Sequence, residues 1–239
     1  MSPPARPRGV QAAPAKPEQA AAGLPSIVKH KTLEGLAYQD IRQAIAEGRL
    51  VPGQRIVVSS LAAASGVSRI PVLQALRRLE TEGFVRITPH KDVVVATLSP
   101  QEFRERFLLL ATLEALCLRE AAGKITPDLI ARLRSLQEEM IIAKRLKNTV
   151  QAAAADSKFH RTLWELAELP HTLRILQSLW DRGEYYRIVM HTRRDGFMKE
   201  SLTEHEELLG ALEANNLERA AQISEEHHLE SMRRLIEVI

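Results

Sequence analysis

The chain has 239 residues, of which 45% are hydrophobic and 26% are charged, as is ordinary for a globular protein with a sizeable core. Its single cysteine, Cys117, excludes an internal disulfide and fits a reducing compartment. No apolar run approaches the roughly 18–20 residues that a membrane span needs, and no secretory signal is visible. These features exclude a disulfide-stapled or membrane-spanning protein and lead us to expect a cytoplasmic one.

The net charge of +3 is unevenly distributed. The net charge is +2 over residues 1–26, +4 over residues 27–98 and −3 over residues 99–239. A basic N-terminal part and a mildly acidic remainder favour a nucleic-acid-binding domain fused to a second domain. Residues 1–28 are rich in Pro and Ala and carry almost no large apolar side chain, so they are predicted to form a disordered tail.

Two short amphipathic segments follow one another between Ile56 and Glu80. Ser59 or Ser60 is predicted to cap the first helix, Gly66 to end it, and Ser68 to cap the second. A buried stripe in the second helix, at i, i+3, i+4 and i+7, consists of Val72, Ala75, Leu76 and Leu79. The opposite face carries Arg69, Leu73, Gln74, Arg77 and Arg78. A short helix, a tight turn and a second helix with cations on its free face form the helix-turn-helix pattern.

The flanks of this pattern distinguish it from an ordinary helical hairpin, which is the alternative interpretation. Residues 32–47 are predicted to form a preceding helix, with an inward face of Leu33, Leu36, Ile41, Ala44 and Ile45. Residues 84–88 and 93–96 are β-branched runs around a basic turn that contains His90 and Lys91, and they predict a small hairpin. Residues 29–98 are therefore predicted to be a winged helix-turn-helix domain.

Residues 36–98 resemble the DNA-binding domain of GntR-type bacterial transcriptional regulators, especially in the stretches GRLVPGQRI, LAAASGVSRIPV and ALRRLETEGFVRI. The resemblance implies binding to a palindromic operator as a homodimer. It implies that Arg69 contacts DNA, and it extends the expected interface to Ser59, Ser68, Gln74, Arg77, Arg78, His90 and Lys91. The chain departs from the family at Ile70, at Leu73-Gln74 and near Asp92, so the operator sequence is not implied.

Residues 99–239 are predicted to be an all-α antiparallel bundle that begins at Ser99-Pro100. Six helices are expected, at residues 100–122, 127–147, 150–168, 171–191, 199–214 and 217–238. The predicted fold is therefore mainly α, with an N-terminal winged helix-turn-helix domain and a C-terminal helical bundle.

Histidines in this bundle suggest a metal site. Asp156 and His160 lie one turn apart on the same helix face, and His205 and His227 lie in the last two helices. By itself the pattern also fits ordinary core or half-exposed histidines. Residues 99–239, however, resemble the metal-binding variety of the FadR-branch ligand-binding domain, known as FCD. That resemblance implies one divalent metal per chain on Asp156, His160, His205 and His227, with zinc expected and nickel, manganese or iron as alternatives. His228 is the alternative to His227.

The same resemblance implies a small carboxylate effector that binds the metal. Family members usually place an arginine four residues before Glu114, where this chain has Leu110. Arg182 and Arg187 are candidate replacements, although they can also be read as surface arginines. Glu204 and Glu206 are interpreted as solvated charges.

The predicted function is a DNA-binding transcriptional regulator that is not an enzyme. A metal-dependent hydrolase or lyase with an accessory DNA-binding domain is the alternative, and an architectural DNA-binding protein is a third hypothesis. The sequence contains no HExxH, G-x-S-x-G or P-loop motif that would favour the enzyme.

Overall fold

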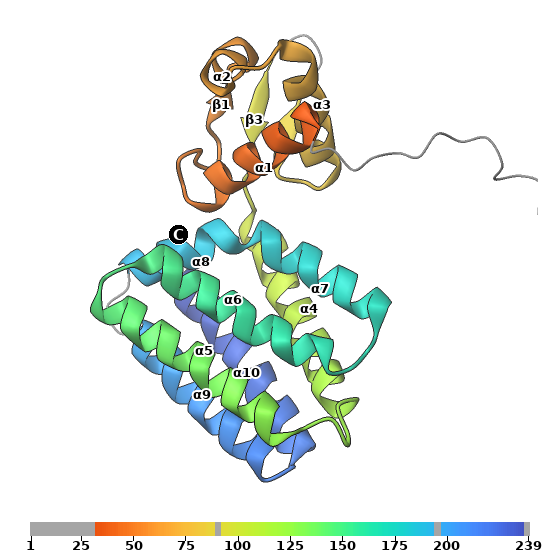
Figure 1. Cartoon of the computed structure of the whole chain (residues 1–239), viewed down its shortest axis with the longest axis vertical. Helices are drawn as coiled ribbons and strands as arrows, with labels where there is room; N and C mark the ends of the chain where they lie inside the picture. The colour runs from red at the N-terminus through yellow and green to blue at the C-terminus, as the bar shows by residue number, and fades with distance from the viewer. Residues whose placement is uncertain (1–31, 89–91, 194–196, 237–239) are drawn as a thin grey trace, which may run out of the picture. The chain divides into compact units, whose positions relative to one another are not determined.

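The computed structural model describes residues 32–88, 92–193 and 197–236, and the predicted N-terminal tail lies outside them (Figure 1). Its N-terminal elements are α1 (Leu33–Ala46), β1 (Arg55–Ile56), α2 (Val58–Ser65), α3 (Arg69–Thr81), β2 (Val85–Ile87) and β3 (Val93–Val95). The helices that follow are α4 (Pro100–Arg119), α5 (Pro127–Arg145), α6 (Thr149–Glu165), α7 (Pro170–Arg182), α8 (Glu184–Arg193), α9 (Phe197–Glu213) and α10 (Leu217–Ile236). The predicted fold class is confirmed.

The helix-turn-helix forms because α3 buries one continuous stripe. Val72, Ala75, Leu76 and Leu79 are fully buried, as the spacing predicts, and they pack with side chains of α1 and the small sheet. Gly66 ends α2 in the left-handed conformation, with φ of 65°, which glycine adopts without steric penalty. The strands are antiparallel in the order β1-β3-β2, so the hairpin of β2 and β3 is the predicted wing.

Several local predictions for this domain are wrong. Strand β1 was not expected, and Ile56 pairs there with Val93. Val57, rather than Ser59 or Ser60, is the N-cap of α2. Ser68 holds the N-cap position of α3, but its side chain makes no capping hydrogen bond. In α1, Leu33 and Leu36 are 56% and 38% exposed, because the core contacts the stripe formed by Ala37, Ile41, Ala44 and Ile45.

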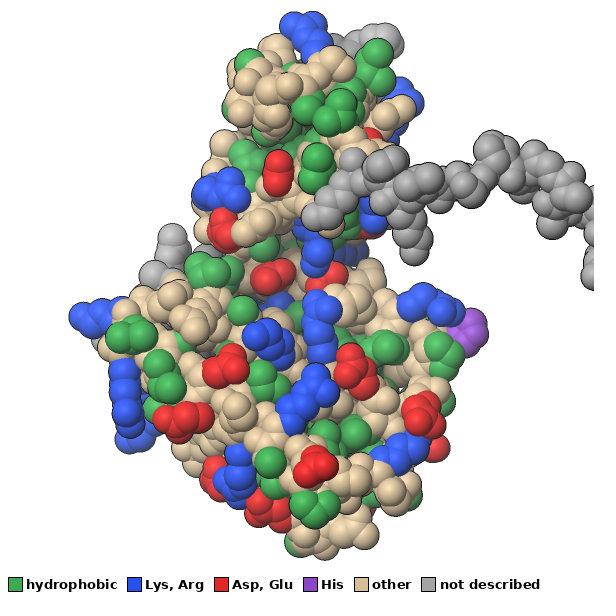
Figure 2. Space-filling model, in the orientation of Figure 1, with side chains coloured by type: hydrophobic (Ala, Val, Ile, Leu, Met, Phe, Trp, Pro, Cys, Tyr) green, Lys and Arg blue, Asp and Glu red, His purple; other side chains and the backbone are tan. Residues whose placement is uncertain are grey.

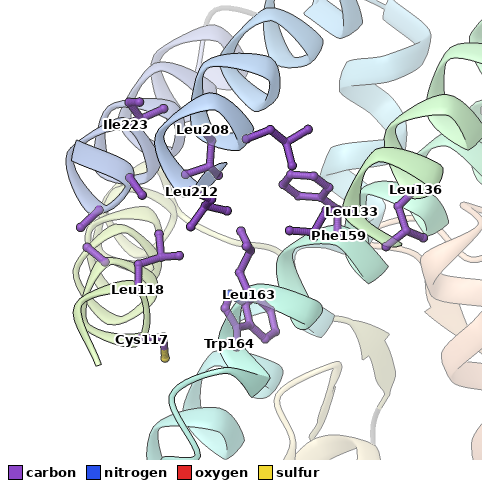
Figure 3. Close-up of a cluster of buried hydrophobic side chains, with 14 of the residues drawn as sticks. Cys117, Leu118, Leu133, Leu136, Phe159, Leu163, Trp164, Leu208, Leu212 and Ile223 are labelled. Carbon is purple, nitrogen blue, oxygen red and sulfur yellow. The ribbon is translucent and has the colours of Figure 1, made fainter. Parts of the chain in front are cut away.

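The helices α4, α5, α6, α7, α9 and α10 share a second core. Ser99 and Glu102 form a reciprocal capping box at the start of α4, which satisfies backbone N–H groups that have no partner within the helix. Side chains from α4, α5, α6, α9 and α10 point toward one another in this core (Figure 3). Cys117 belongs to it, and burial raises the pKa of its thiol to about 12, as expected for an inert structural cysteine.

The predicted helix over residues 171–191 is two helices, because the chain breaks at Gly183 between α7 and α8. A Cβ at this position would lie 3.1 Å from Arg187 Nη1, 3.3 Å from Arg106 Nη1 and 3.4 Å from the Trp180 carbonyl oxygen. Glycine therefore lets two guanidinium groups approach the backbone at the end of α7. No helix within the described residues is both long and apolar enough to cross a membrane.

Candidate metal centre and DNA interface

The four predicted metal ligands lie together inside the helical domain. Ligand nitrogens of His160, His205 and His227 lie within 4.8 Å of one another, and all three side chains are buried. Asp156 Oδ1 lies 3.8 Å from His160 Nε2 and 3.8 Å from His205 Nε2. Helices α6, α9 and α10 thus bring three imidazoles and one carboxylate to one point. On the face shown in Figure 2, histidine is visible only at the edge of the helical domain.

The hydrogen-bonding state of these rings fits a metal. His160 Nε2 and both ring nitrogens of His205 are buried and have no hydrogen-bond partner in the part of the chain that the structure describes. Such orphaned polar atoms are costly in a protein interior unless a ligand satisfies them. Donors bound to one ion at about 2.1 Å lie at most about 4.2 Å apart, so a small inward movement of the side chains completes the set. Nitrogen and oxygen donors in this mixture suit first-row transition metals.

Glu114 orients His160 from the opposite side. Both of its oxygens lie 2.9 Å from His160 Nδ1, so this nitrogen donates and Nε2 is left free for a metal. The carboxylate also accepts from Ser224 Oγ at 2.7 Å and from the indole N–H of Trp164. Burial raises the pKa of Glu114, but the charges of His160 and His228 outweigh burial and hold the pKa well below its usual range. Glu114 is therefore an ionised group that links α4, α6 and α10.

His228 is buried and also contacts Glu114. It is 2% exposed, and its Nε2 lies 3.2 Å from Glu114 Oε1. Ligand atoms of Glu114, His160 and His228 also lie within 4.8 Å of one another, so these residues form a second group that could hold a metal. Because the carboxylate already accepts from Trp164 and Ser224, we interpret the group as support for His160. His227 therefore remains the proposed ligand from α10.

Glu204 supports His227 in the same way, and its interpretation as a solvated charge is wrong. Its Oε2 lies 2.6 Å from His227 Nδ1, and Arg234 pairs with the same carboxylate. Burial raises the pKa of Glu204, but the hydrogen bonds from His227 and Arg234 dominate and lower it to about 2. Glu206 is exposed as predicted and pairs with Arg134.

The pKa values of His160 and His205 shift in opposite directions because the surroundings of the two rings differ. Burial lowers the pKa of His160, but the charge and hydrogen bond of Glu114 outweigh it and raise the pKa. Burial, with the neighbouring His227 and His160, holds the pKa of His205 well below its usual range. His205 also stacks on Phe159, with ring centroids 4.4 Å apart. It is thus fixed as a neutral imidazole, the form that binds metals.

The predicted effector arginines fall in different places. Arg187 is 8% exposed, so it is not the solvated arginine of the alternative interpretation, and its guanidinium lies over the Trp180 ring at 3.9 Å. Arg182 is partly buried, and its Nε has no hydrogen-bond partner. Leu110, at the family arginine position, is 2% exposed within the apolar core. Sequence reasoning missed Arg106, one turn earlier on α4, which is 4% exposed.

The free face of α3 presents most of the predicted DNA contacts. Arg69, Gln74 and Arg77 are exposed on this helix, Ser68 is exposed at its N-cap, and Ser59 is exposed on α2. Arg78 differs from them, because it forms ion pairs with Glu82 and Glu34 and lies over the Tyr38 ring at 3.8 Å. Arg78 therefore joins α3 to α1. His90 and Lys91 lie outside the described residues.

Residues 34–95 match the family described as "Bacterial regulatory proteins, gntR family", and residues 105–230 match the FCD domain. A helix-turn-helix regulator from the TAR-I ttuE-ttuC' intergenic region of Agrobacterium vitis is 34% identical over 130 residues, which are 53% of this chain and 76% of the relative. The regulator McbR of Escherichia coli K12 is 24% identical over 192 residues, which are 80% of this chain and 87% of McbR.

Solved structures agree in fold. Escherichia coli McbR/YncC has a TM-score of 0.75 at 22% identity, with 86% of this chain and 98% of that chain covered. A GntR regulator from Rhodococcus sp. RHA1 has a TM-score of 0.73 at the same identity and coverage. With a winged helix-turn-helix domain followed by an FCD domain, the chain belongs to the GntR family of bacterial transcriptional regulators.

Proposed function

We propose that this regulator changes its operator affinity when a small organic acid binds a divalent metal in the FCD domain. The observation that carries the proposal is a buried cluster next to Asp156 in which His160 Nε2 and both ring nitrogens of His205 have no hydrogen-bond partner among the described residues. An apolar core would not hold orphaned polar atoms unless a ligand compensated for them. We therefore propose that the FCD domain binds its metal at this cluster of histidines and Asp156.

Each residue has a role that its contacts support. Asp156, His160, His205 and His227 are the proposed ligands, with zinc expected and nickel, manganese or iron as alternatives. Glu114 and Glu204 orient His160 and His227 through the nitrogens that face away from the ion. When bound, the ion supplies coordination positions that the protein leaves open, and a carboxylate can fill them. Arg187 and Arg182 are the proposed cationic groups near the acid.

A calorimetric titration tests this function directly. Mono-, di- and tricarboxylates are titrated into metal-loaded and metal-stripped protein, and operator affinity is measured by fluorescence anisotropy after each addition. We expect at least one acid to bind only the loaded form and to change operator affinity; linkage then requires the operator to change acid affinity by the same factor. Equal binding to both forms would make the metal structural. Conversion of the acid to a product would instead support the metal-dependent hydrolase or lyase.

The proposed DNA interface gives a prediction for Arg69, at the start of α3. Recognition helices of this class place their N-terminal residues at base edges in the major groove. We expect Arg69→Ala to weaken specific operator binding by about 1–3 kcal/mol, measured by anisotropy at fixed salt. Arg145→Ala, which removes an exposed arginine from α5, is the matched control and should leave affinity unchanged. An unchanged affinity in the Arg69 variant would remove it from the interface.

The proposed homodimer is supported by an apolar stripe on α4. Leu109 and Leu116 are 42% and 36% exposed, with the partly buried Leu113 between them, and this spacing puts the three on one helix face. Palindromic operators require a two-fold arrangement of helix-turn-helix domains, so a second copy is the proposed occupant. We expect Leu109→Glu/Leu116→Glu to sediment as a monomer and to bind the operator more weakly. A dimeric double variant would place the interface elsewhere.

A further inference from the structure

Among the described residues, two buried arginines of the FCD domain, Arg106 and Arg187, donate to backbone carbonyl oxygens rather than to carboxylates. Arg106 on α4 donates to the Leu179 carbonyl at 3.2 Å, and its Nε has no hydrogen-bond partner. Arg187 on α8 donates to the Trp180 carbonyl at 3.0 Å, and its Nε and Nη2 have no partner. Both side chains are more than nine-tenths buried. Carbonyl oxygens satisfy one N–H group each but do not neutralise either charge.

The two guanidinium groups converge on one place. A Cβ built at Gly183 would lie 3.1 Å from Arg187 Nη1 and 3.3 Å from Arg106 Nη1, so both groups border the backbone where α7 ends. Burial and the nearby charges of Arg182 and Arg187 lower the pKa of Arg106 to about 9. Burial lowers the pKa of Arg187 to about 10. The location is therefore strongly cationic, and an anion would relieve its excess charge.

The charges of Glu184, Asp156 and Asp181 raise the pKa of Arg187 but only partly offset the effect of burial. Asp181 accepts a hydrogen bond from Arg161 at 2.9 Å, and Glu102 accepts one from the Ser99 backbone at 2.8 Å in the capping box of α4. Asp156 lies beside the proposed metal ligands His160 and His205. Buried charge that is only partly compensated is unfavourable, so the two arginines favour an anionic ligand beside them.

This cationic group lies beside the proposed metal centre. Arg187 contacts the Trp180 ring at 3.9 Å, and the His160 ring centroid lies 4.7 Å from that of Trp180. Arg106 is two helical turns before Glu114 on α4, about 12 Å along the axis. An acid held at the metal through one carboxylate could therefore direct a second anionic group toward the arginines.

We propose that Arg106 and Arg187 form an anion-binding subsite for a second acidic group of the effector, which is thus an acid with at least two anionic groups. The inference rests on the proposed function and specifies the class of effector. Family members usually have one arginine at the position of Leu110. In this chain a pair would take its place, with Arg106 one turn earlier on α4 and Arg187 near the start of α8. Arg106 and Arg187 are then specificity-determining residues.

The test compares acids that differ only in the second carboxylate. Succinate with butyrate, glutarate with valerate and adipate with hexanoate are titrated by calorimetry into the metal-loaded full-length protein. We expect one diacid to bind at least about tenfold more tightly than its matched monoacid, because hydrogen bonds to charged groups contribute that much. Arg106→Gln and Arg187→Gln should reduce this ratio to about one. Arg134→Gln, which removes an exposed ion-paired arginine of α5, should preserve it.

The outcomes separate this inference from the proposed function. If monoacids and diacids bind equally well, the subsite is wrong while the metal-bound acid stands. If no acid binds, the proposed effector class is wrong. Thermal melts of metal-free protein in phosphate at constant ionic strength then test whether Arg106 and Arg187 bind an anion. A phosphate-induced rise in melting temperature that both Gln variants lose identifies a phosphorylated ligand, and an equal rise in all three proteins overturns the subsite. Arg106→Lys, which keeps the charge, serves as the second variant if Arg106→Gln fails to fold.

Discussion

Chelation of the divalent ion is expected to lower the melting temperature of the FCD domain by roughly 10 °C. A ligand that binds only the folded state stabilises it by about 4 kcal/mol when its free concentration is a thousand times its dissociation constant. In a domain of this size about 1 kcal/mol corresponds to a few degrees. Differential scanning calorimetry of metal-loaded and chelator-treated protein measures the shift. An unchanged transition would show that the ion does not bind this domain in its folded form.

The proposed ligands account for this effect only if their removal abolishes metal binding. His160→Ala/His205→Ala removes two imidazoles from α6 and α9, and mass spectrometry of the purified protein should find far less than one ion per chain. His171→Ala, which removes an exposed histidine from α7, is the matched control and should retain the full ion content. The melting temperature of the double variant should not respond to chelator. One ion per chain in the double variant would contradict the site.

Replacing Glu114 by Gln is expected to destabilise the metal-free protein by about 3–5 kcal/mol, as measured by urea unfolding. The fully buried carboxylate accepts from His160, Trp164 and Ser224, and breaking a buried ion pair leaves a charge without a partner. The metal should bind about 10–100-fold more weakly, because His160 loses the group that orients it. A competition titration with a fluorescent chelator measures that affinity.

A matched carboxylate separates this role from a general effect of charge removal. Glu206→Gln removes an exposed carboxylate of α9 that pairs with Arg134, and surface pairs contribute about 0–1 kcal/mol. Its stability and metal affinity should stay close to those of the unmodified protein. If Glu114→Gln behaved like Glu206→Gln, the buried carboxylate would be dispensable and His160 would be oriented by its packing alone.

The winged domain could be predicted from the sequence where hydrophobic periodicity was strong. The stripe from Val72 to Leu79 fits one helix face, and all four members are buried. The pattern failed in the first turn of α1, where Leu33 and Leu36 are apolar but exposed, although Leu33 shares a helix face with the buried Ala37. Periodicity describes which residues share a face. It does not describe how far along the helix the neighbouring elements extend.

In the FCD domain, the family resemblance rather than the residue pattern alone predicted the four ligands, which stay a prediction, and the structure places these four side chains close together. The surrounding network could not be predicted in the same way. Arg106 and Glu204 look like surface charges in the sequence, and only tertiary packing shows that one is buried and the other holds His227. The break at Gly183 was missed because an isolated glycine inside a helical pattern does not by itself predict the end of a helix.

The connection between the two domains, residues 96–98, is short and is anchored by hydrogen bonds at both ends. Ala96 N–H donates to the Phe84 carbonyl at 2.9 Å, which ties it to the wing, and Leu98 N–H donates to the Tyr186 hydroxyl at 3.1 Å, which ties it to α8. Thr97 alone separates these two anchored residues. The helix that starts directly afterwards carries both Arg106 and Glu114. A ligand that rotates α4 about its axis would therefore also move the hairpin of β2 and β3. Only one residue separates the two anchors, so the connection is too short to absorb the rotation.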